Sequence, residues 1–221
     1  ARLLLTPDDF RCLRILRHHR PLGPGVDLAV WSLADAREIA VTVLLHQGHR
    51  ALDGEATEAG YALADQWGLA TSSRDLTALS VELDTSDLRL SVSVDYEVAE
   101  LSVRGPRDEL DHAVQLLADV LHHPTFPTSE LRRYQRERST WLRKDAPNDL
   151  MTTLRAGLDN VWYAPGQPYG DRPDLRALAK VRPTDLTARH QRLLASPATI
   201  LVVGDVEGDR KSTRLNSSHL V

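Results

Sequence analysis

The sequence has little of several features that mark common classes of protein. It contains one cysteine, Cys12, among 221 residues, which excludes an internal disulfide framework and a cysteine-rich zinc site. It has no run of about 18 apolar residues, the length of a membrane-spanning helix. Basic residues are not in excess, since the formal net charge is −4, which argues against a nucleic-acid platform. We therefore expect no nucleic-acid or membrane partner, and we expect the cytoplasm as the compartment.

The apolar content is sufficient for one well-packed domain. Apolar residues make up 42% of the chain and recur at helix and strand spacing. No linker or change of composition divides residues 1–208, so we expect a single domain there.

Residues 209–221 differ in character from the rest of the chain. They show no apolar periodicity, and one permissible back-translation of Asp209–His219 resembles the adapter ligated to DNA fragments for short-read sequencing. We expect this stretch to be a disordered artefact; the alternative is an ordinary disordered terminus. On this interpretation residues 1–208 are a fragment, truncated at both ends, since the chain also starts at Ala1 without a methionine.

Period-two alternation predicts a half-covered strand at Leu88–Tyr96. Its apolar side chains point one way, and Arg89, Ser91 and Ser93 point the other way. Ala99–Val103 repeats the pattern, so we expect the two segments to pair antiparallel. Further strands are predicted at Phe10–Arg17, Val26–Leu33, Glu38–His46 and Ala198–Val203, with a turn at Pro21–Gly25.

Helical signals fill most of the remaining chain. Leu110, Val114, Leu117 and Leu121 form an apolar stripe at helical spacing. Thr128 or Ser129 is expected to cap a long basic helix that ends at Lys144. Other helices are predicted at Thr57–Trp67, Asp75–Leu83, Asn148–Tyr163, Asp174–Lys180 and Thr184–Leu194. This order predicts an α+β fold: a two-layer sandwich with a mostly antiparallel sheet and helices packed on one face.

Four segments in this order resemble the pitrilysin/insulinase (inverzincin) family of zinc metallopeptidases, of the mitochondrial-processing-peptidase-like kind. They are Leu121–Leu131 (LHHPTFPTSEL), Pro168–Gly170 followed by Leu175 and Leu178, Thr184–Leu186, and Thr199–Val206 (TILVVGDV). Each segment is a weak signal by itself, but together they cover most of residues 38–207. The resemblance implies a metallopeptidase half-domain.

Members of this family resemble a clamshell of two homologous halves, in one chain or in two subunits. The active half carries H-x-x-E-H on a helix, where two His bind zinc and the Glu activates a water. A further Glu from a later helix is the third ligand.

The resemblance places the zinc-binding positions on residues that differ from the family pattern. The two His positions fall on Tyr61 and Asp65, the catalytic Glu falls on Ala64, and the later Glu falls near Trp141. Neither H-x-x-E-H nor H-E-x-x-H occurs in the sequence. We therefore expect no catalytic residue and no metal site in this chain, and we expect zinc in an active partner half.

Two groups of residues near these positions allow alternative interpretations. Tyr61, Trp67 and Trp141 are interpreted as core residues that fill the former metal pocket, the alternative being an aromatic surface for substrate or partner. The basic series from Arg132 to Lys144 shares its helix with Glu130 and Glu137, which predicts ion pairs along a solvated helix face. The alternative for this series is an anion-binding surface.

The leading functional hypothesis is an inactive half or subunit that pairs with an active homologous half and helps to enclose a peptide. In the family the peptide can add as a strand to a sheet edge, and Arg89, Ser91 and Ser93 are the substrate-binding candidates; alternatively they are only the solvent face. A second hypothesis is a fragment of an active zinc metalloendopeptidase whose H-x-x-E-H half lies outside this chain. A stand-alone scaffold is a third.

Overall fold

The computed structural model describes residues 18–48, 57–163 and 174–206. A six-stranded sheet with the strand order β1-β2-β6-β3-β5-β4 forms one layer of the fold. Neighbouring strands are antiparallel, except β2 and β6, which run parallel. The strands are β1 (His18–Gly23), β2 (Val26–Ser32), β3 (Glu38–Leu45), β4 (Arg89–Val94), β5 (Ala99–Pro106) and β6 (Ala198–Gly204).

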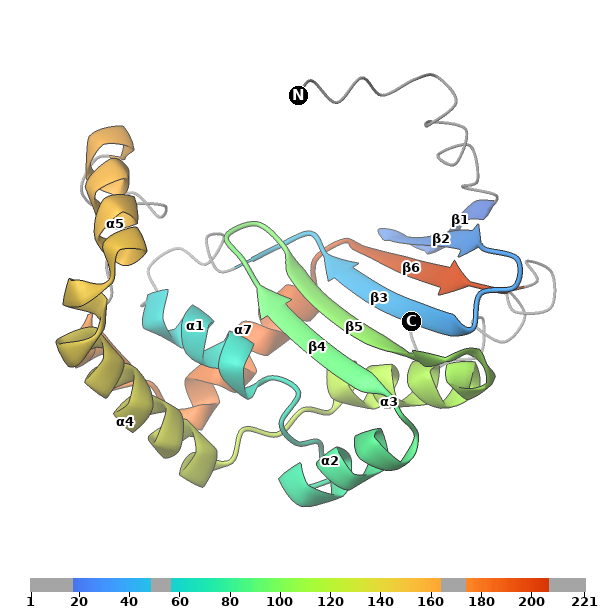
Figure 1. Ribbon diagram of the computed structural model, residues 1–221, viewed down its shortest axis with the longest axis horizontal. Helices are drawn as coiled ribbons and strands as arrows, with labels where there is room; N and C mark the ends of the chain where they lie inside the picture. Colours follow the sequence, from blue (N-terminus) through green and yellow to red (C-terminus); the bar gives the residue numbers. More distant parts are fainter. Residues whose placement is uncertain (1–17, 49–56, 164–173, 207–221) are drawn as a thin grey trace.

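The helices gather on one side of the sheet, and α4 and α5 continue beyond it, with α5 projecting from the body (Figure 1). α1, α2 and α3 contact the sheet, and α7 and α4 pack on α1. This is the predicted α+β arrangement. The helices are α1 (Thr57–Gln66), α2 (Leu76–Thr85), α3 (Leu110–His122), α4 (Thr128–Lys144), α5 (Leu150–Trp162), α6 (Leu175–Leu178) and α7 (Pro183–Leu194), with short 3-10 turns at Arg107–Glu109 and Ala146–Asn148.

Alternation along the central strands decides which face the helices cover. Val41 and Val43 on β3 and Leu101 on β5 are buried in the core on the helix side. On the opposite face Thr42 lies opposite Ser102, and their hydroxyl groups share a hydrogen bond of 2.9 Å. Because successive strand residues point to opposite faces, the buried apolar residues of β3 and β5 all lie on one face of the sheet. The helices pack on that face.

The carboxyl end of α3 is held by side chains from two other helical segments. The Nε1 group of Trp67 donates to the Val120 carbonyl at 2.9 Å, a carbonyl that its usual helical partner, Pro124, cannot satisfy because proline has no N–H. The Nε2 group of His190 on α7 donates to the Leu121 carbonyl at 2.8 Å. The two rings meet edge to face with centroids 4.8 Å apart. These contacts join α3 and α7 to the end of α1.

The structure corrects the predicted turn at Pro21–Gly25. Pro21 and Gly23 belong to β1, and the turn is confined to Pro24 and Gly25. β1 is an edge strand, where proline is tolerated because its missing N–H faces away from the neighbouring strand. Gly25 has φ of 75°, the left-handed conformation that a tight turn places on glycine.

The predicted cap of the long basic helix was also wrong. Thr128 and Ser129 lie inside α4, and the capping position is Pro127, which makes no side-chain capping bond. Pro127 has φ −61° and ψ 131°, the extended conformation usual for an N-cap residue, and α4 begins there without a side-chain acceptor. Two further expectations, the strand at Phe10–Arg17 and the character of residues 209–221, lie outside the described residues. None of the described helices has the length and apolar character needed to cross a membrane.

Candidate functional site

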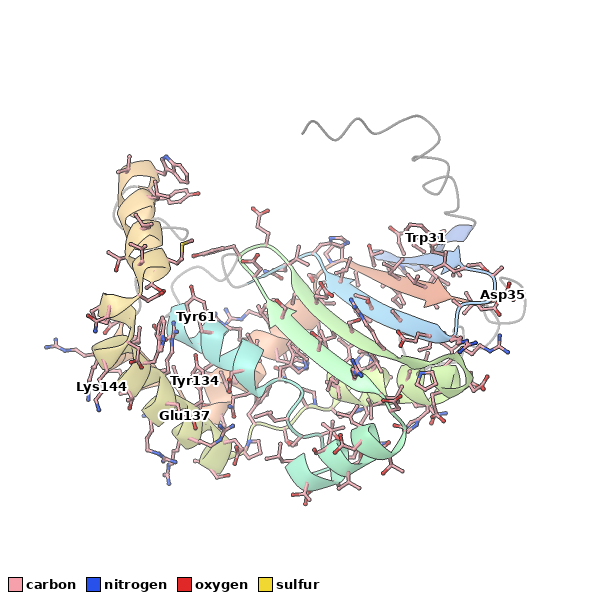
Figure 2. All side chains as sticks on the ribbon, viewed as in Figure 1. Trp31, Asp35, Tyr61, Tyr134, Glu137 and Lys144 are labelled. Carbon is pink, nitrogen blue, oxygen red and sulfur yellow. The ribbon has the colours of Figure 1, made fainter. Side chains whose placement is uncertain are left out.

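Helix α1 carries three of the four positions at which the resemblance implies a zinc site. Tyr61, Ala64 and Asp65 share one helical side because their spacing is i, i+3 and i+4. Tyr61 is half-buried, Ala64 packs against the core, and Asp65 is exposed and accepts a hydrogen bond of 2.8 Å from Nε2 of Gln66. Tyr61 and Tyr134 lie where α1 and α4 approach each other (Figure 2).

The guanidinium of Arg138 occupies the space between α1 and the fourth position. Its Cζ atom lies 5.2 Å from the ring centroid of Tyr61 and 4.8 Å from that of Trp141. Both distances are those of a cation–π contact. The structure therefore brings Tyr61 and Trp141 together through a protein cation that lies against both rings.

A hydrogen bond ties this cluster to the sheet edge. Tyr61 bonds with the side chain of Tyr96, which lies in the turn between β4 and β5. Burial is the main reason that the pKa of the Tyr61 hydroxyl lies well above its usual value, and the bond with Tyr96 raises it further. Tyr61 is therefore a neutral phenol at physiological pH.

A buried carboxyl lies beneath the cluster. Glu58 is 1% exposed, and its Oε1 atom accepts a hydrogen bond of 3.1 Å from the backbone N–H of Asp174, whereas Oε2 is buried without a partner. Burial raises the pKa of Glu58, and the positive charge of Arg138 opposes that rise. Burial also raises the pKa of the nearby Tyr134 hydroxyl.

These residues do not fit a zinc ion. The Tyr61 hydroxyl is protonated and bonded to Tyr96, Ala64 has no donor atom, and the indole N–H of Trp141 is a hydrogen-bond donor only. The Arg138 guanidinium would also repel a metal cation at this place. Within residues 18–48, 57–163 and 174–206, no group of three or more His, Cys, Asp or Glu side chains could hold a metal.

Trp67 is part of the hydrophobic core rather than of this cluster. It is 2% exposed, and its N–H is used by the Val120 carbonyl. Of the three aromatic residues considered from the sequence, only Tyr61 and Trp141 contact Arg138, and both are partly buried.

Strand β4, at one edge of the sheet, runs beside α1. Arg89, Ser91 and Ser93 are exposed and lie opposite Arg104, Ser102 and Glu100 of β5, on the face away from the helices. The intervening Leu90 and Val92 face the helix side, where a Cβ atom on Gly68 would lie 2.9 Å from Val92 Cγ2. The face of β4 that borders α1 is therefore apolar, and the three predicted residues lie on its other face.

Sequence reasoning missed the two ionisable groups at the centre of the cluster. Arg138 was grouped with the solvated arginines of α4, and Glu58 was not singled out. A signal existed for Arg138, because it lies one helical turn after the buried Tyr134 and three residues before Trp141. The ion pairs predicted along α4 are confirmed at Arg133, which bonds Glu130 and Glu137.

No protein-family model and no curated protein matches the sequence. The fold is nevertheless similar to solved structures of proteases. A protease from Helicobacter pylori matches 91% of this chain with a TM-score of 0.77 and 18% identity. A peptidase M16 inactive domain from Pseudomonas fluorescens matches 92% of this chain with a TM-score of 0.78 and 16% identity. The described chain spans 49% of each of these two structures.

The periplasmic protease PqqL from Escherichia coli shows how much of a whole protease such a unit represents. The chain matches the first half of PqqL with a TM-score of 0.77 and 15% identity, over 92% of this chain and 45% of that half. It spans 23% of the whole PqqL structure. The fold seen here thus corresponds to about half of one PqqL half. The strand order, the one-sided helices and these likenesses give this chain the fold of an insulinase-like M16 peptidase half-domain.

Proposed function

We propose that this chain is a non-catalytic part of an insulinase-like zinc metallopeptidase, and that it pairs with an active homologous half or subunit to enclose a peptide substrate. The observation that carries the proposal is the cluster at the zinc-binding positions. Tyr61 and Trp141 lie against a protein cation, and the resemblance assigns the position of the general base to Ala64. Zinc and its activated water are assigned to the partner.

The neighbouring folds support the pairing. One of them is a peptidase M16 inactive domain, and the chain spans less than a quarter of PqqL. A unit of this size would depend on further domains, in the same chain or in another subunit, to close a chamber. The cytoplasm remains our proposed compartment.

The edge of β4 is the proposed place of peptide contact. An extended peptide that adds to an edge strand gains backbone hydrogen bonds with little sequence preference. Arg89, Ser91 and Ser93 would flank the added strand on the open face, and Leu90 and Val92 would flank it on the α1 face. The other edge strand, β1, lies at the far side of the sheet and serves as an internal control.

Hydrogen exchange tests this contact directly. We expect an unstructured peptide to slow amide exchange in β4 and to leave β1 unchanged. A matched peptide with N-methylated alternate residues should lose the effect, because it lacks the donors of a strand ladder. Equal slowing at both edges, or no slowing at β4, would contradict strand addition.

Peptide hydrolysis measured with and without the proposed partner tests the pairing. We expect the same gene or its neighbour to encode H-x-x-E-H, and the isolated chain to leave peptides intact. Mixed with that partner, the chain should raise peptide hydrolysis, and replacing the partner's motif Glu with Gln should abolish it. Hydrolysis by the purified chain alone would overturn the proposal.

The alternative, a fragment of an active metalloendopeptidase whose motif lies elsewhere in the same polypeptide, is favoured by the small share of PqqL that the chain spans. An H-x-x-E-H sequence in the same open reading frame would select it. The motif on a separate neighbouring gene would select the two-subunit form.

A further inference from the structure

Arg138 has donor groups that no residue of the described chain uses. Its Nε atom is buried without a partner, and no hydrogen bond or ion pair joins its side chain to another residue in the described ranges. Nε is the one nitrogen of this side chain that is both buried and without a partner. The two terminal Nη groups therefore keep access to solvent. Arg133 on the same helix differs from Arg138, because it forms ion pairs with Glu130 and Glu137.

The two aromatic contacts leave those Nη groups free to bind. A cation–π contact places the guanidinium over the face of an aromatic ring and gives its N–H groups no oxygen acceptor, so these donors can still bind an anion. The Cζ atom of Arg138 lies 5.2 Å from the ring centroid of Tyr61 and 4.8 Å from that of Trp141, so two rings fix the position of its guanidinium. A guanidinium held in this way is pre-organised for a carboxylate, whose two oxygens match the two Nη groups.

The surroundings favour an external anion rather than an internal one. The positive charge of Arg138 acts on the buried carboxyl of Glu58, but no ion pair joins these two side chains. Its Oε1 atom is already engaged by the Asp174 backbone. Asp65, on the outer side of α1, accepts a hydrogen bond from Gln66. Within the part of the chain that the structure describes, the positive charge of Arg138 therefore has no direct counter-ion.

The position of the cluster relates it to the peptide edge. Tyr61 links Arg138 to Tyr96, and Tyr96 follows the last residues of β4. A peptide along β4 would thus pass close to the Arg138 cluster at this end of the strand.

We propose that Arg138, held between Tyr61 and Trp141, is a carboxylate-binding site for the peptide that lies along β4. The proposal rests on the proposed peptide contact and adds to it a preference for peptides that carry a carboxylate at this position. The carboxylate is either the α-carboxylate of a peptide end or the side chain of an Asp or Glu, since both present the same pair of oxygens. The site that is expected to hold a metal cation in active relatives would here hold an anion.

Four fluorescent peptides, arranged as two matched pairs, separate the two sources. One pair differs only in a terminal acid or amide and contains no Asp or Glu. The second pair is amidated and differs only in one internal Glu or Gln. We expect the wild-type 221-residue chain to bind the carboxylate member of at least one pair about tenfold more tightly, the size of one charge-assisted bond.

Variants of α4 assign the preference to this residue. Arg138→Gln should bind both members of the preferred pair equally, and Arg138→Lys should keep part of the preference because it keeps the charge. Arg136→Met, which removes an exposed arginine of the same helix, should leave the preference unchanged. Urea unfolding of each variant shows that the compared proteins are folded.

The outcomes distinguish the two proposals. Binding of all four peptides with equal affinity by the wild-type chain would overturn the carboxylate site and leave strand addition standing. A preference that persists in Arg138→Gln would also overturn it. Absence of binding for every peptide would overturn the proposed peptide contact together with the site that rests on it.

Discussion

Arg138 of α4 lies with its guanidinium carbon 5.2 Å from the ring centroid of Tyr61 of α1. These two residues join α1 and α4, the helices on which the resemblance implies the positions of the metal ligands. Here a cation from the protein and an aromatic ring meet at that junction.

The ring and the hydroxyl of Tyr61 make separable contributions to stability. Tyr61→Phe keeps the contact with Arg138 and loses the bond to Tyr96, so we expect a loss of about 1 kcal/mol in the free energy of unfolding. Tyr61→Ala also loses the ring, and we expect about 2–3 kcal/mol. Urea denaturation measures both. Equal losses for the two variants would show that the ring does not stabilise the helix junction.

The indole N–H of Trp67 is expected to matter because the Val120 carbonyl has no helical partner. Trp67→Phe would leave that buried carbonyl unsatisfied and create a small cavity, so we expect a loss of roughly 2–4 kcal/mol. Trp162→Phe is the matched control: Trp162 is 67% exposed, and a change within about 0.5 kcal/mol is expected there. Similar losses for both variants in thermal or urea unfolding would contradict this role.

His112 is expected to make stability depend on pH. Its ring nitrogens bond Glu82 at 2.8 Å and Glu109 at 2.9 Å, and these carboxylates raise the pKa of His112. The resulting stabilisation is fully present below the unfolded-state pKa of about 6.5 and is lost as the pH rises through the folded-state value. Hydrogen bonds from Arg74 and His112 lower the pKa of Glu82, so this carboxylate stays charged at mildly acidic pH.

The measurement compares unfolding of the wild type and His112→Gln from pH 5.5 to pH 9. The difference in free energy of unfolding should be largest near pH 5.5 and shrink toward pH 9. A difference that grows with pH would have the wrong sign for this account. His190 offers a contrast in an NMR titration, because burial lowers its pKa, so it should titrate below His112.

Local patterns in the sequence predicted most individual elements. The alternation of apolar and polar residues in Leu88–Tyr96 predicted β4 and its exposed polar face. The apolar stripe from Leu110 to Leu121 predicted α3. These succeed because strand and helix periodicity follow directly from which side chains are buried. The parallel pairing of β2 with β6 was not predicted, since it joins segments from opposite ends of the chain and leaves no local signal.

The candidate site was predicted in part. The resemblance selected Tyr61 and Trp141, and the structure brings both to one place. It could not reveal Arg138, because the surrounding arginines and glutamates of α4 have the composition of a solvated face. Whether a given arginine points outward or between two rings depends on how α4 packs on α1, which is a tertiary property. The same holds for Glu58, whose burial depends on α1 and the Asp174 backbone.

The zinc content of the purified chain tests the central claim most directly. The chain would be equilibrated with zinc, passed through a desalting column and measured by elemental analysis, with a relative that retains H-x-x-E-H as the positive control. We expect the control to retain about one zinc per chain and this protein to retain far less, because residues 18–48, 57–163 and 174–206 offer no ligand set. Stoichiometric zinc bound around Tyr61, Asp65 and the Trp141 end of α4 would contradict the account.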